Sequence, residues 1–276
     1  MIDTDDDDID VLRSEIKRLR KTLTDLTSSL DVLLKRRGLM VYKKEPSEDL
    51  LIPEDRFIDK YYEMLKKYSF RLFLREVIKY QQGFIPERLT RYATADVTAD
   101  YVAYLKEIGL IDKRGEEYFL IKQPIRSFGE TLEWFLSEVM KRGFSVEAIW
   151  GVKCKGSKIG GDYDLIAKVD GMILYMEVKS SPPKQIYQSE ISAFFDRISD
   201  ILADISIFFM DTQLRMKDKI VLMFEEELKK RETNPSHVCR IEKELFHVWN
   251  RVFIINSKGG IENNIEKVLR WYFEQH

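Results

Sequence analysis

The sequence predicts an α/β (α+β) chain in which a mixed central sheet flanked by helices forms the C-terminal part. Three observations indicate this organisation. Residues 9–37 carry a heptad stripe of aliphatic side chains, residues 56–123 show helical periods that end in a short hairpin pattern, and residues 124–276 alternate helical and strand patterns. An acidic tail (1–8) precedes the stripe, and residues 38–55 are interpreted as a linker because glycine and prolines interrupt them.

The composition excludes several classes of protein. The 276 residues include 45 basic and 47 acidic side chains, a net charge of −2, so a uniformly basic nucleic-acid coat is excluded while a local basic site is not. Two cysteines and three histidines are too few and too scattered for a disulfide framework or a zinc finger. The start is acidic, and no apolar run approaches the roughly 20 residues that span a bilayer. We therefore expect a cytoplasmic protein without a membrane partner.

The heptad stripe predicts a coiled coil over residues 9–37. Its members follow one another in steps of three and four: Ile9, Leu12, Ile16, Leu19, Leu23, Leu26, Leu30 and Leu33. A lone helix that exposes such a stripe is unstable in water, so the stripe must meet an apolar partner. We expect a homodimer, with packing onto this chain's own domains as the alternative; the pattern does not fix the number or direction of strands.

Residues 56–123 combine helical patterns with a terminal hairpin pattern. Apolar helical faces are followed by a helix that Pro86 opens, by another that starts at Thr94, and by an alternating segment around Gly115. This order of elements resembles a winged helix-turn-helix domain. DNA reading by the helix around 95–107 is one interpretation. A structural or protein-contact role is the other, because this helix is acidic and phosphates would repel it.

The C-terminal part predicts a helix followed by a β-hairpin that carries the polar residues. A helix over 128–143 precedes a strand and a stretch rich in lysine and glycine. Two apolar strands then flank Asp170-Gly171, which is a strong hairpin signal. Further strands are expected at 205–210 and 252–255, with a closing helix over 261–273. The charged insertion between those two strands, about 213–250, has no assigned role.

The hairpin brings charged side chains together at one end. Alternation along a strand places Glu177 and Lys179 on the same face, and the tight turn pairs Asp164 with Glu177 across the ladder. Two facing carboxylates cost energy unless a cation lies between them, and either Lys179 or a divalent metal supplies that charge. Because the ligands are oxygens, with no His or Cys beside them, the metal expected is Mg²⁺ or Mn²⁺. An ordinary ion-pair network is the alternative interpretation.

Asp164 followed by Glu177-Val178-Lys179 resembles the PD-(D/E)XK nuclease superfamily, whose fold is restriction-endonuclease-like. The spacing is most similar to archaeal Holliday-junction resolvase-like domains, although Tyr163 stands where the motif has proline. The resemblance covers about 127–180.

This resemblance implies roles for individual residues. Asp164, Glu177 and the carbonyl of Val178 would hold the metal, and Glu133 would assist through water or a second ion, with Glu130 as the alternative helix glutamate. Lys179 would orient or deprotonate the attacking water. Asp162 is a further possible ligand. The residues expected to bind the DNA backbone are Lys153, Lys155 and Lys158.

The function expected is a metal-dependent DNA endonuclease or structure-selective nuclease that acts as a coiled-coil dimer on duplex or branched DNA. The alternative is a catalytically inactive DNA-binding or regulatory adaptor that keeps the nuclease fold. A purely structural coiled-coil scaffold is a third interpretation.

Overall fold

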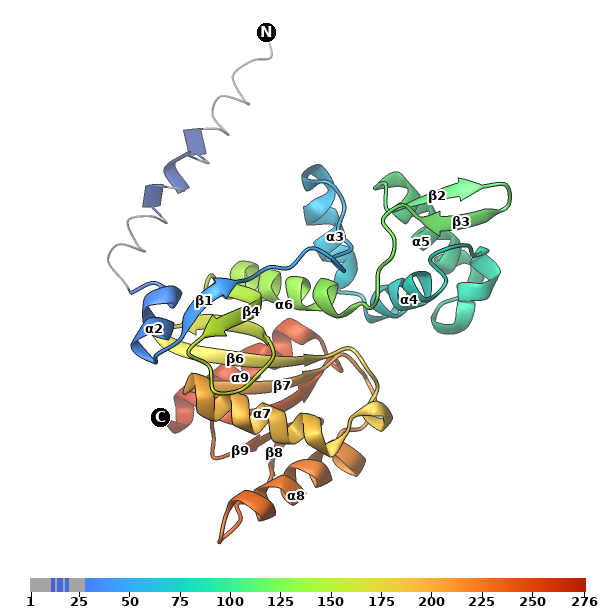
Figure 1. Cartoon of the computed structure of the whole chain (residues 1–276). Coiled ribbons are helices and arrows are strands. Elements are labelled where there is room, and N and C mark those ends of the chain that lie inside the picture. Colours follow the sequence, from blue (N-terminus) through green and yellow to red (C-terminus); the bar gives the residue numbers. More distant parts are fainter. Residues whose placement is uncertain (1–10, 13, 17, 20–27) are drawn as a thin grey trace.

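The computed structural model describes residues 11–12, 14–16, 18–19 and 28–276, and its centre is a mixed β-sheet (Figure 1). Within these residues the sheet has eight strands in the order β1-β4-β5-β6-β7-β10-β9-β8. Strand β7 runs parallel to both β6 and β10, and the other pairs are antiparallel. The strands are β1 (Met40–Lys43), β4 (Glu147–Lys155), β5 (Tyr163–Val169), β6 (Met172–Lys179), β7 (Ile205–Met210), β8 (Cys239–Glu242), β9 (Leu245–Val248) and β10 (Val252–Asn256). The predicted mixed sheet is confirmed.

Helices cover both faces of this sheet. Helices α6 (Gly129–Gly143) and α9 (Ile261–Gln275) pack on one face, whereas α7 (Gln188–Ile201) and α8 (Leu222–Arg231) pack on the other. The alternation of side chains along β6 feeds both layers: Leu174 joins the core under α6 and α9, and its neighbour Tyr175 joins the core under α7. The sheet is therefore buried on both sides, as its long apolar runs predict.

The hairpin of β5 and β6 has the predicted register. Leu165 pairs with Met176, and Val169 pairs with Met172, on either side of the turn. Both turn residues, Asp170 and Gly171, have positive φ angles of 48° and 83°, which is the conformation that an Asp-Gly hairpin turn requires.

The predicted linker is wrong over its first part. Met40–Lys43 forms β1, an edge strand that pairs antiparallel with β4. Leu39 and Leu51, on either side of it, are buried. The strand was not predicted because glycine, lysines and proline surround it. An exposed edge strand needs few apolar residues and tolerates charged ones.

The end of the heptad stripe packs on this chain itself. Helix α2 (Leu30–Arg36) starts afresh after Ser29, whose hydroxyl accepts a hydrogen bond from the Val32 N–H, so one helix does not continue across residue 29. Leu30 and Leu33 are buried in the core under α7. For these two positions the alternative, packing on the chain's own domain, is confirmed.

The rest of the coiled-coil prediction falls largely outside the described residues. Those between 11 and 19 that the structure describes are helical, and Leu12, Ile16 and Leu19 among them are at least half exposed. Because these three apolar side chains are exposed, an apolar partner for residues 9–27 stays a prediction.

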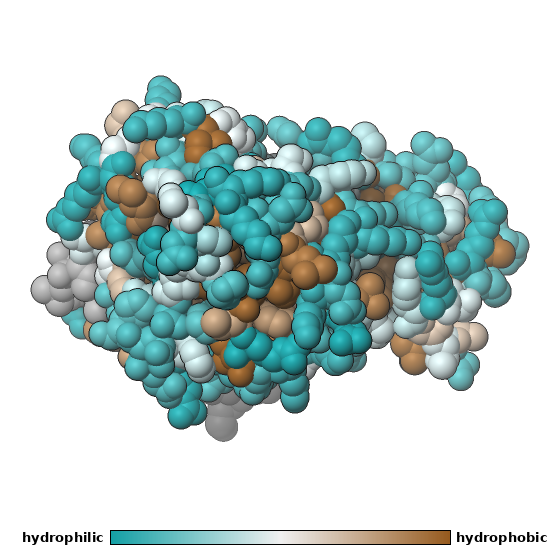
Figure 2. All heavy atoms as spheres, turned by 90° about the horizontal axis from the view of Figure 1, so that it is seen from below, coloured by the Kyte–Doolittle hydropathy of each residue, from teal (hydrophilic) through white to brown (hydrophobic). Residues whose placement is uncertain are grey.

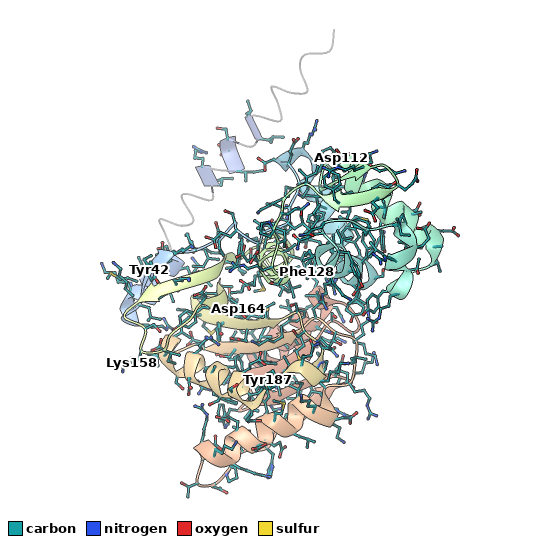
Figure 3. The ribbon with its side chains drawn as sticks, turned by 45° about the vertical axis from the view of Figure 1, so that its right-hand side comes forward. Tyr42, Asp112, Phe128, Lys158, Asp164 and Tyr187 are labelled. Atoms are coloured by element: carbon teal, nitrogen blue, oxygen red, sulfur yellow. The ribbon has the colours of Figure 1, made fainter. Side chains whose placement is uncertain are left out.

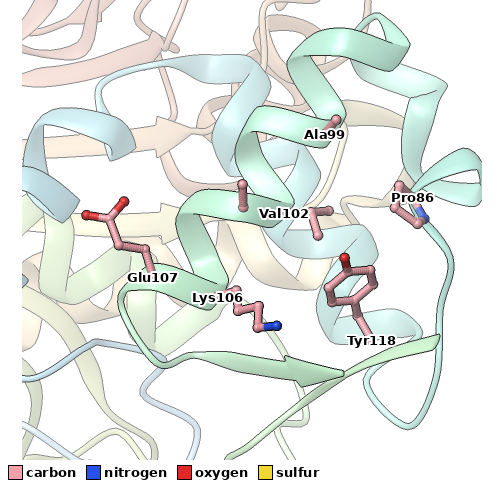
Figure 4. Close-up of a pocket in the computed structure, with 7 residues that line it drawn as sticks. Pro86, Ala99, Val102, Lys106, Glu107 and Tyr118 are labelled. Carbon is pink, nitrogen blue, oxygen red and sulfur yellow. The ribbon is translucent and has the colours of Figure 1, made fainter. Parts of the chain in front are cut away.

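The middle of the chain follows the predicted order of elements. It contains α3 (Ile58–Leu65), α4 (Tyr68–Lys79), the 3₁₀ helix η2 (Pro86–Tyr92), α5 (Ala95–Glu107) and the antiparallel pair β2 (Ile111–Arg114) and β3 (Glu117–Leu120). The third helix is thus a 3₁₀ helix. A surface pocket of about 510 Å³ lies between α5, Pro86 and Tyr118 (Figure 4). Lys106 and Glu107 both line this pocket, so its charges largely cancel. The pocket therefore favours neither DNA reading by α5 nor a structural role of that helix.

This helical unit shares a core with the sheet domain. Tyr61 stacks on Trp134 of α6, and Tyr62 packs against Phe135. Arg71 of α4 binds Asp211, which directly follows β7, and both side chains are almost fully buried. The boundary predicted near residue 123 is therefore crossed by a continuous apolar core.

The insertion between β7 and β10 extends the sheet. It holds the π-helix η4 (Lys217–Val221), α8, and the β8–β9 pair that forms the far edge. In the part of the chain that the structure describes, no helix is both long and apolar enough to cross a membrane.

Candidate active site

Asp164 lies where β5 and β6 separate. The ladder between these strands ends at Leu165 and Met176. Beyond it, the Asp164 carboxylate accepts a hydrogen bond from the main-chain N–H of Val178, with 2.7 Å between Oδ2 and N. A side chain thus replaces the next strand-to-strand hydrogen bond, and it fixes Asp164 at the mouth of the opening.

Glu133, on helix α6, contacts the neighbouring strand β4 at a position beside Asp164. Gly151 lies between the two residues of β4 that pair with Leu165 and Tyr163, so it is beside Asp164. A Cβ atom built on Gly151 would be 3.8 Å from Oε2 of Glu133. Gly151 also has a φ of +56°, which L side chains rarely adopt. The Glu133 carboxylate is thus at ordinary contact distance from β4, whereas the atom that requires glycine here is Cδ of Pro46, with which such a Cβ would collide.

The two carboxylates are electrostatically strained. Burial, and then the charges of Asp164 and Glu130, raise the pKa of Glu133 well above its usual value. Burial and the charge of Glu177 likewise raise the pKa of Asp164, although the Val178 N–H and Lys179 act in the opposite direction. A nearby cation would relieve this strain, since an opposite charge favours the ionised form.

Glu177 is almost fully buried and already has cationic partners. Its carboxylate pairs with Lys179 (Nζ–Oε1 3.0 Å) and with Arg197 of α7 (Nη1–Oε2 3.1 Å), and it accepts a hydrogen bond from the Tyr175 hydroxyl. The contact between Glu177 and Lys179 confirms that these residues share a face.

Lys179 is held between two carboxylates. Besides Glu177, its ammonium lies 3.0 Å from Oε1 of Glu190 on α7. Burial alone would lower the pKa of Lys179, but Glu177 and Asp164 outweigh it and raise that pKa. Lys179 is therefore a fixed positive charge at neutral pH.

Sequence reasoning missed three residues of this site: Tyr175, Glu190 and Arg197. A signal for two of them exists, because Glu190 and Arg197 are seven positions apart and so lie on one face of a helix. Tyr175 has the same face as Glu177 on β6 by alternation. What could not be inferred was that α7 packs across this end of the sheet.

In the described part of the chain, the other predicted residues are not among the hydrogen-bond and ion-pair partners of Asp164, Glu177 and Lys179. Lys153 pairs with Asp162 at 3.2 Å, so the possible extra ligand already has a cationic partner. Lys155 ends β4, and Lys158 lies in the loop that follows; both side chains are exposed (Lys158 is labelled in Figure 3). Glu130 accepts a hydrogen bond from the Asp49 N–H.

The engagement of Glu130 favours Glu133 as the helix glutamate of the site. Over the described ranges, the structure contains no group of three or more His, Cys, Asp or Glu side chains arranged to hold a metal ion.

Comparison with known proteins gives limited similarity. No protein-family model matches the sequence, and the search of curated proteins finds no match. Among solved structures, the protein VC1899 from Vibrio cholerae is similar with a TM-score of 0.46 and 11% identity, over 70% of this chain and 54% of that chain. Can2 from Sulfobacillus thermosulfidooxidans, solved with cyclic tetra-adenylate, has a TM-score of 0.44 and 13% identity, over 88% of this chain and 60% of its own.

This chain therefore spans less than two thirds of either structure. Similarity at this level does not decide the function, for which the residues of the site are the basis.

Proposed function

We propose that this chain is a metal-dependent nuclease that hydrolyses phosphodiester bonds of DNA. The observation that supports the proposal is the position of Asp164 at the separation of two strands, beside Glu133 and next to the charged Lys179. Buried carboxylates with raised pKa values beside a fixed cation are typical of catalytic sites rather than of surface ion pairs.

The donor atoms are oxygens, which suit a hard divalent cation, and Glu177 would exchange its contacts with Lys179 and Arg197 for the ion. Among the described residues, only one oxygen of Asp164 has a hydrogen-bond partner, and the site offers oxygens without His or Cys. Asp164, Glu177 and the Val178 carbonyl would hold Mg²⁺ or Mn²⁺, with Glu133 acting through water or a second ion. When bound, such an ion lowers the pKa of a ligand water and neutralises charge on the phosphoryl oxygens.

Lys179 acts in this proposal as a positive charge and hydrogen-bond donor. Its raised pKa keeps the ammonium protonated, so it orients the attacking water and stabilises the negative charge that develops on the phosphate. A lysine that removes the proton itself would need a lowered pKa. Glu190 and Glu177 hold Nζ in place for this task.

Exposed lysines beside the site would contact the DNA backbone. Lys155 and Lys158 have no ion-pair partner among the described residues, whereas Lys153 shares its charge with Asp162. Phosphate contacts of this kind position a duplex without reading its sequence. Because one site cuts one strand, a duplex or a junction needs two sites, which a dimer formed through residues 9–27 would supply.

The test is cleavage of duplex and branched DNA by the full chain with Mg²⁺ or Mn²⁺. We expect Asp164→Asn and Lys179→Ala to lower the rate by at least about 10²-fold, as for the loss of a charged group from a transition state. Asp59→Asn, whose side chain is 91% exposed, is the matched control and should keep full activity. A wild type that binds DNA but cuts no substrate with either metal contradicts the proposal.

That outcome would favour the second candidate, a DNA-binding adaptor without catalysis. One observation supports it: the charge of Glu177 is already matched by Lys179 and Arg197 without a metal ion. In an adaptor, Asp164→Asn would leave DNA binding unchanged, because its role would be confined to the fold.

A further inference from the structure

Tyr187 is an exposed aromatic residue next to the candidate active site. Its exposed fraction is 73%, the largest among the exposed large hydrophobic side chains of the described residues. It directly precedes α7 and follows the loop after β6 (Figure 3). Exposure of so much aromatic surface to water is unfavourable, and no packing role offsets it here.

The backbone of Tyr187 is rigidly held. Prolines 182 and 183 open a short 3₁₀ turn, and Ile186, the residue just before Tyr187, is buried. Lys219 of η4 donates hydrogen bonds from Nζ to the carbonyls of Lys184 and Ile186, each at 2.9 Å. The ring is therefore displayed from a fixed position rather than from a flexible loop.

One carboxylate connects Tyr187 to Lys179. Oε2 of Glu190 accepts a hydrogen bond from the Tyr187 N–H at 2.9 Å, and Oε1 of the same group pairs with Lys179 at 3.0 Å. The main chain of Tyr187 and the ammonium of Lys179 are thus placed relative to each other by a single side chain.

Exposed cationic and hydrophobic side chains occur on the two segments that Lys219 joins, the loop after β6 and the chain after β7. Lys184 is exposed in the same loop. Leu214 and Leu222 are exposed by 58% and 62% on the chain that follows β7. Seen from the α8 side, the surface is mainly hydrophilic, with hydrophobic residues gathered near its middle (Figure 2).

We propose that Tyr187 stacks on an unpaired nucleobase, so that the substrate of this site is single-stranded or splayed nucleic acid. The inference rests on the proposed nuclease function and specifies its substrate class. An aromatic ring beside cations that hold the backbone is the arrangement with which proteins grip single strands. A base within a duplex is stacked on its neighbours and offers no free face to the ring.

The test measures binding in EDTA, where no cleavage occurs. The full chain, Tyr187→Ala, Tyr187→Phe and Phe273→Ala are titrated into a labelled oligo-dT strand and a blunt duplex of equal length, with fluorescence anisotropy as the readout. Phe273 is the matched control, because it is an exposed aromatic on α9, across the sheet from α7. The alanine variant keeps the main-chain hydrogen bonds of Tyr187, so α7 keeps its first turn.

We expect Tyr187→Ala to weaken oligo-dT binding by about fivefold or more and to leave duplex binding within about twofold. Tyr187→Phe and Phe273→Ala should bind like the wild type. Unchanged oligo-dT binding by Tyr187→Ala overturns the assignment, as does an equal loss on both ligands. A wild type that does not bind oligo-dT also overturns it and leaves a protein partner as the occupant of this surface.

Cleavage separates this inference from the proposed function. If the wild type cuts duplex DNA with Mg²⁺ while Tyr187→Ala keeps its oligo-dT binding, the nuclease stands and the role of Tyr187 falls. If nothing is cut but oligo-dT binding depends on Tyr187, the nuclease falls and the stacking role stands.

Discussion

Arg71 and Asp211 form an ion pair whose side chains are 1% and 0% exposed, with 2.7 Å between Nη2 and Oδ1. Arg71 belongs to α4 of the helical unit, whereas Asp211 follows β7 of the sheet. The main-chain N–H of Asp211 also donates to the carbonyl of Lys179 at 2.9 Å. The pair therefore joins the helical unit to the strand end that carries the candidate active site.

Asp211→Asn is expected to destabilise the fold by about 3–5 kcal/mol, since it leaves the buried Arg71 without its counter-charge. Urea unfolding measures this loss. The matched control is Glu107→Gln, which breaks an exposed pair with Lys60 and should cost about 1 kcal/mol or less. If the two variants lose the same free energy of unfolding, the buried ion pair stabilises the fold no more than an exposed one.

The contribution of Asp211 should also depend on pH. Burial alone would raise its pKa, but Arg71 and Arg75 outweigh burial and lower it. A lowered pKa in the folded state means that the stabilisation is complete above the unfolded value, about 3.9, and is lost as the pH falls through the folded value. The stability difference between wild type and Asp211→Asn should therefore shrink below about pH 4. A difference that stays constant down to acid unfolding contradicts this assignment.

Glu133→Gln is expected to stabilise the metal-free protein at neutral pH. The folded state raises the pKa of Glu133, so ionisation of this group opposes folding once the pH exceeds its unfolded value of about 4.3. The gain in Tm, measured in EDTA, should thus be larger at pH 8 than at pH 4. Glu138→Gln, on the same helix, is the control; it weakens ion pairs with Lys141 and Arg142 and should not stabilise. A Tm below that of the wild type for Glu133→Gln at pH 8 would falsify the idea that the charges of Glu133 and Asp164 destabilise the metal-free fold.

Arg197→Gln is expected to raise the affinity for Mn²⁺ by roughly tenfold, or about 1.4 kcal/mol, because the guanidinium competes for Glu177. Isothermal titration of the full chain with Mn²⁺ measures this change. Arg231→Gln, on α8, removes a cation that pairs with Asp196 and Glu227 instead, and it should leave the affinity unchanged. An affinity that falls in Arg197→Gln excludes Glu177 as a metal ligand.

Lys155→Gln and Lys158→Gln are each expected to weaken duplex binding by a similar factor on every sequence. Each should also reduce the slope of log K against log salt by about 0.9, as for the loss of one phosphate contact. Salt titrations of DNA binding provide the measurement. Lys60→Gln, in the helical unit, is the control for a general loss of charge. Unchanged slopes in both variants remove these lysines from the DNA surface.

Removal of residues 1–27 is expected to convert a dimer into a monomer without unfolding the rest. The helix that starts after Ser29 has its own cap, and Leu30 and Leu33 are buried in this chain, so the cut falls before any packed residue of α2. Light scattering after size-exclusion chromatography gives the mass, and circular dichroism checks the fold. A full chain that is already monomeric contradicts the coiled-coil prediction.

The hairpin could be predicted from the sequence because its signals are local. Asp170-Gly171 sets the turn, and the period of two then fixes which residues face one another, so the neighbourhood of Asp164 and Glu177 follows from counting. The strands at 205–210 and 252–255 were likewise evident from their apolar runs, and the second extends one residue further in the structure.

What the sequence could not supply is contact between distant segments. Arg197 and Glu190 reach Glu177 and Lys179 only because α7 packs across the end of β6, which no local pattern encodes. The strand at 40–43 was not predicted for a related reason, since its partner β4 lies more than a hundred residues further along the chain. The stripe at 9–37 misled at its end, since Leu30 and Leu33 fit a coiled-coil seam and a domain core equally well.

The strand β1 has a practical consequence for how this molecule can be divided. An excised fragment that begins at residue 124 would lose both β1 and α2, leaving β4 without its outer neighbour and uncovering the apolar side chains beneath Leu30 and Leu33. Bare strand edges invite pairing with other chains. A fragment made to isolate the sheet should therefore begin at residue 28 and include the intervening helices. A shorter fragment is expected to aggregate.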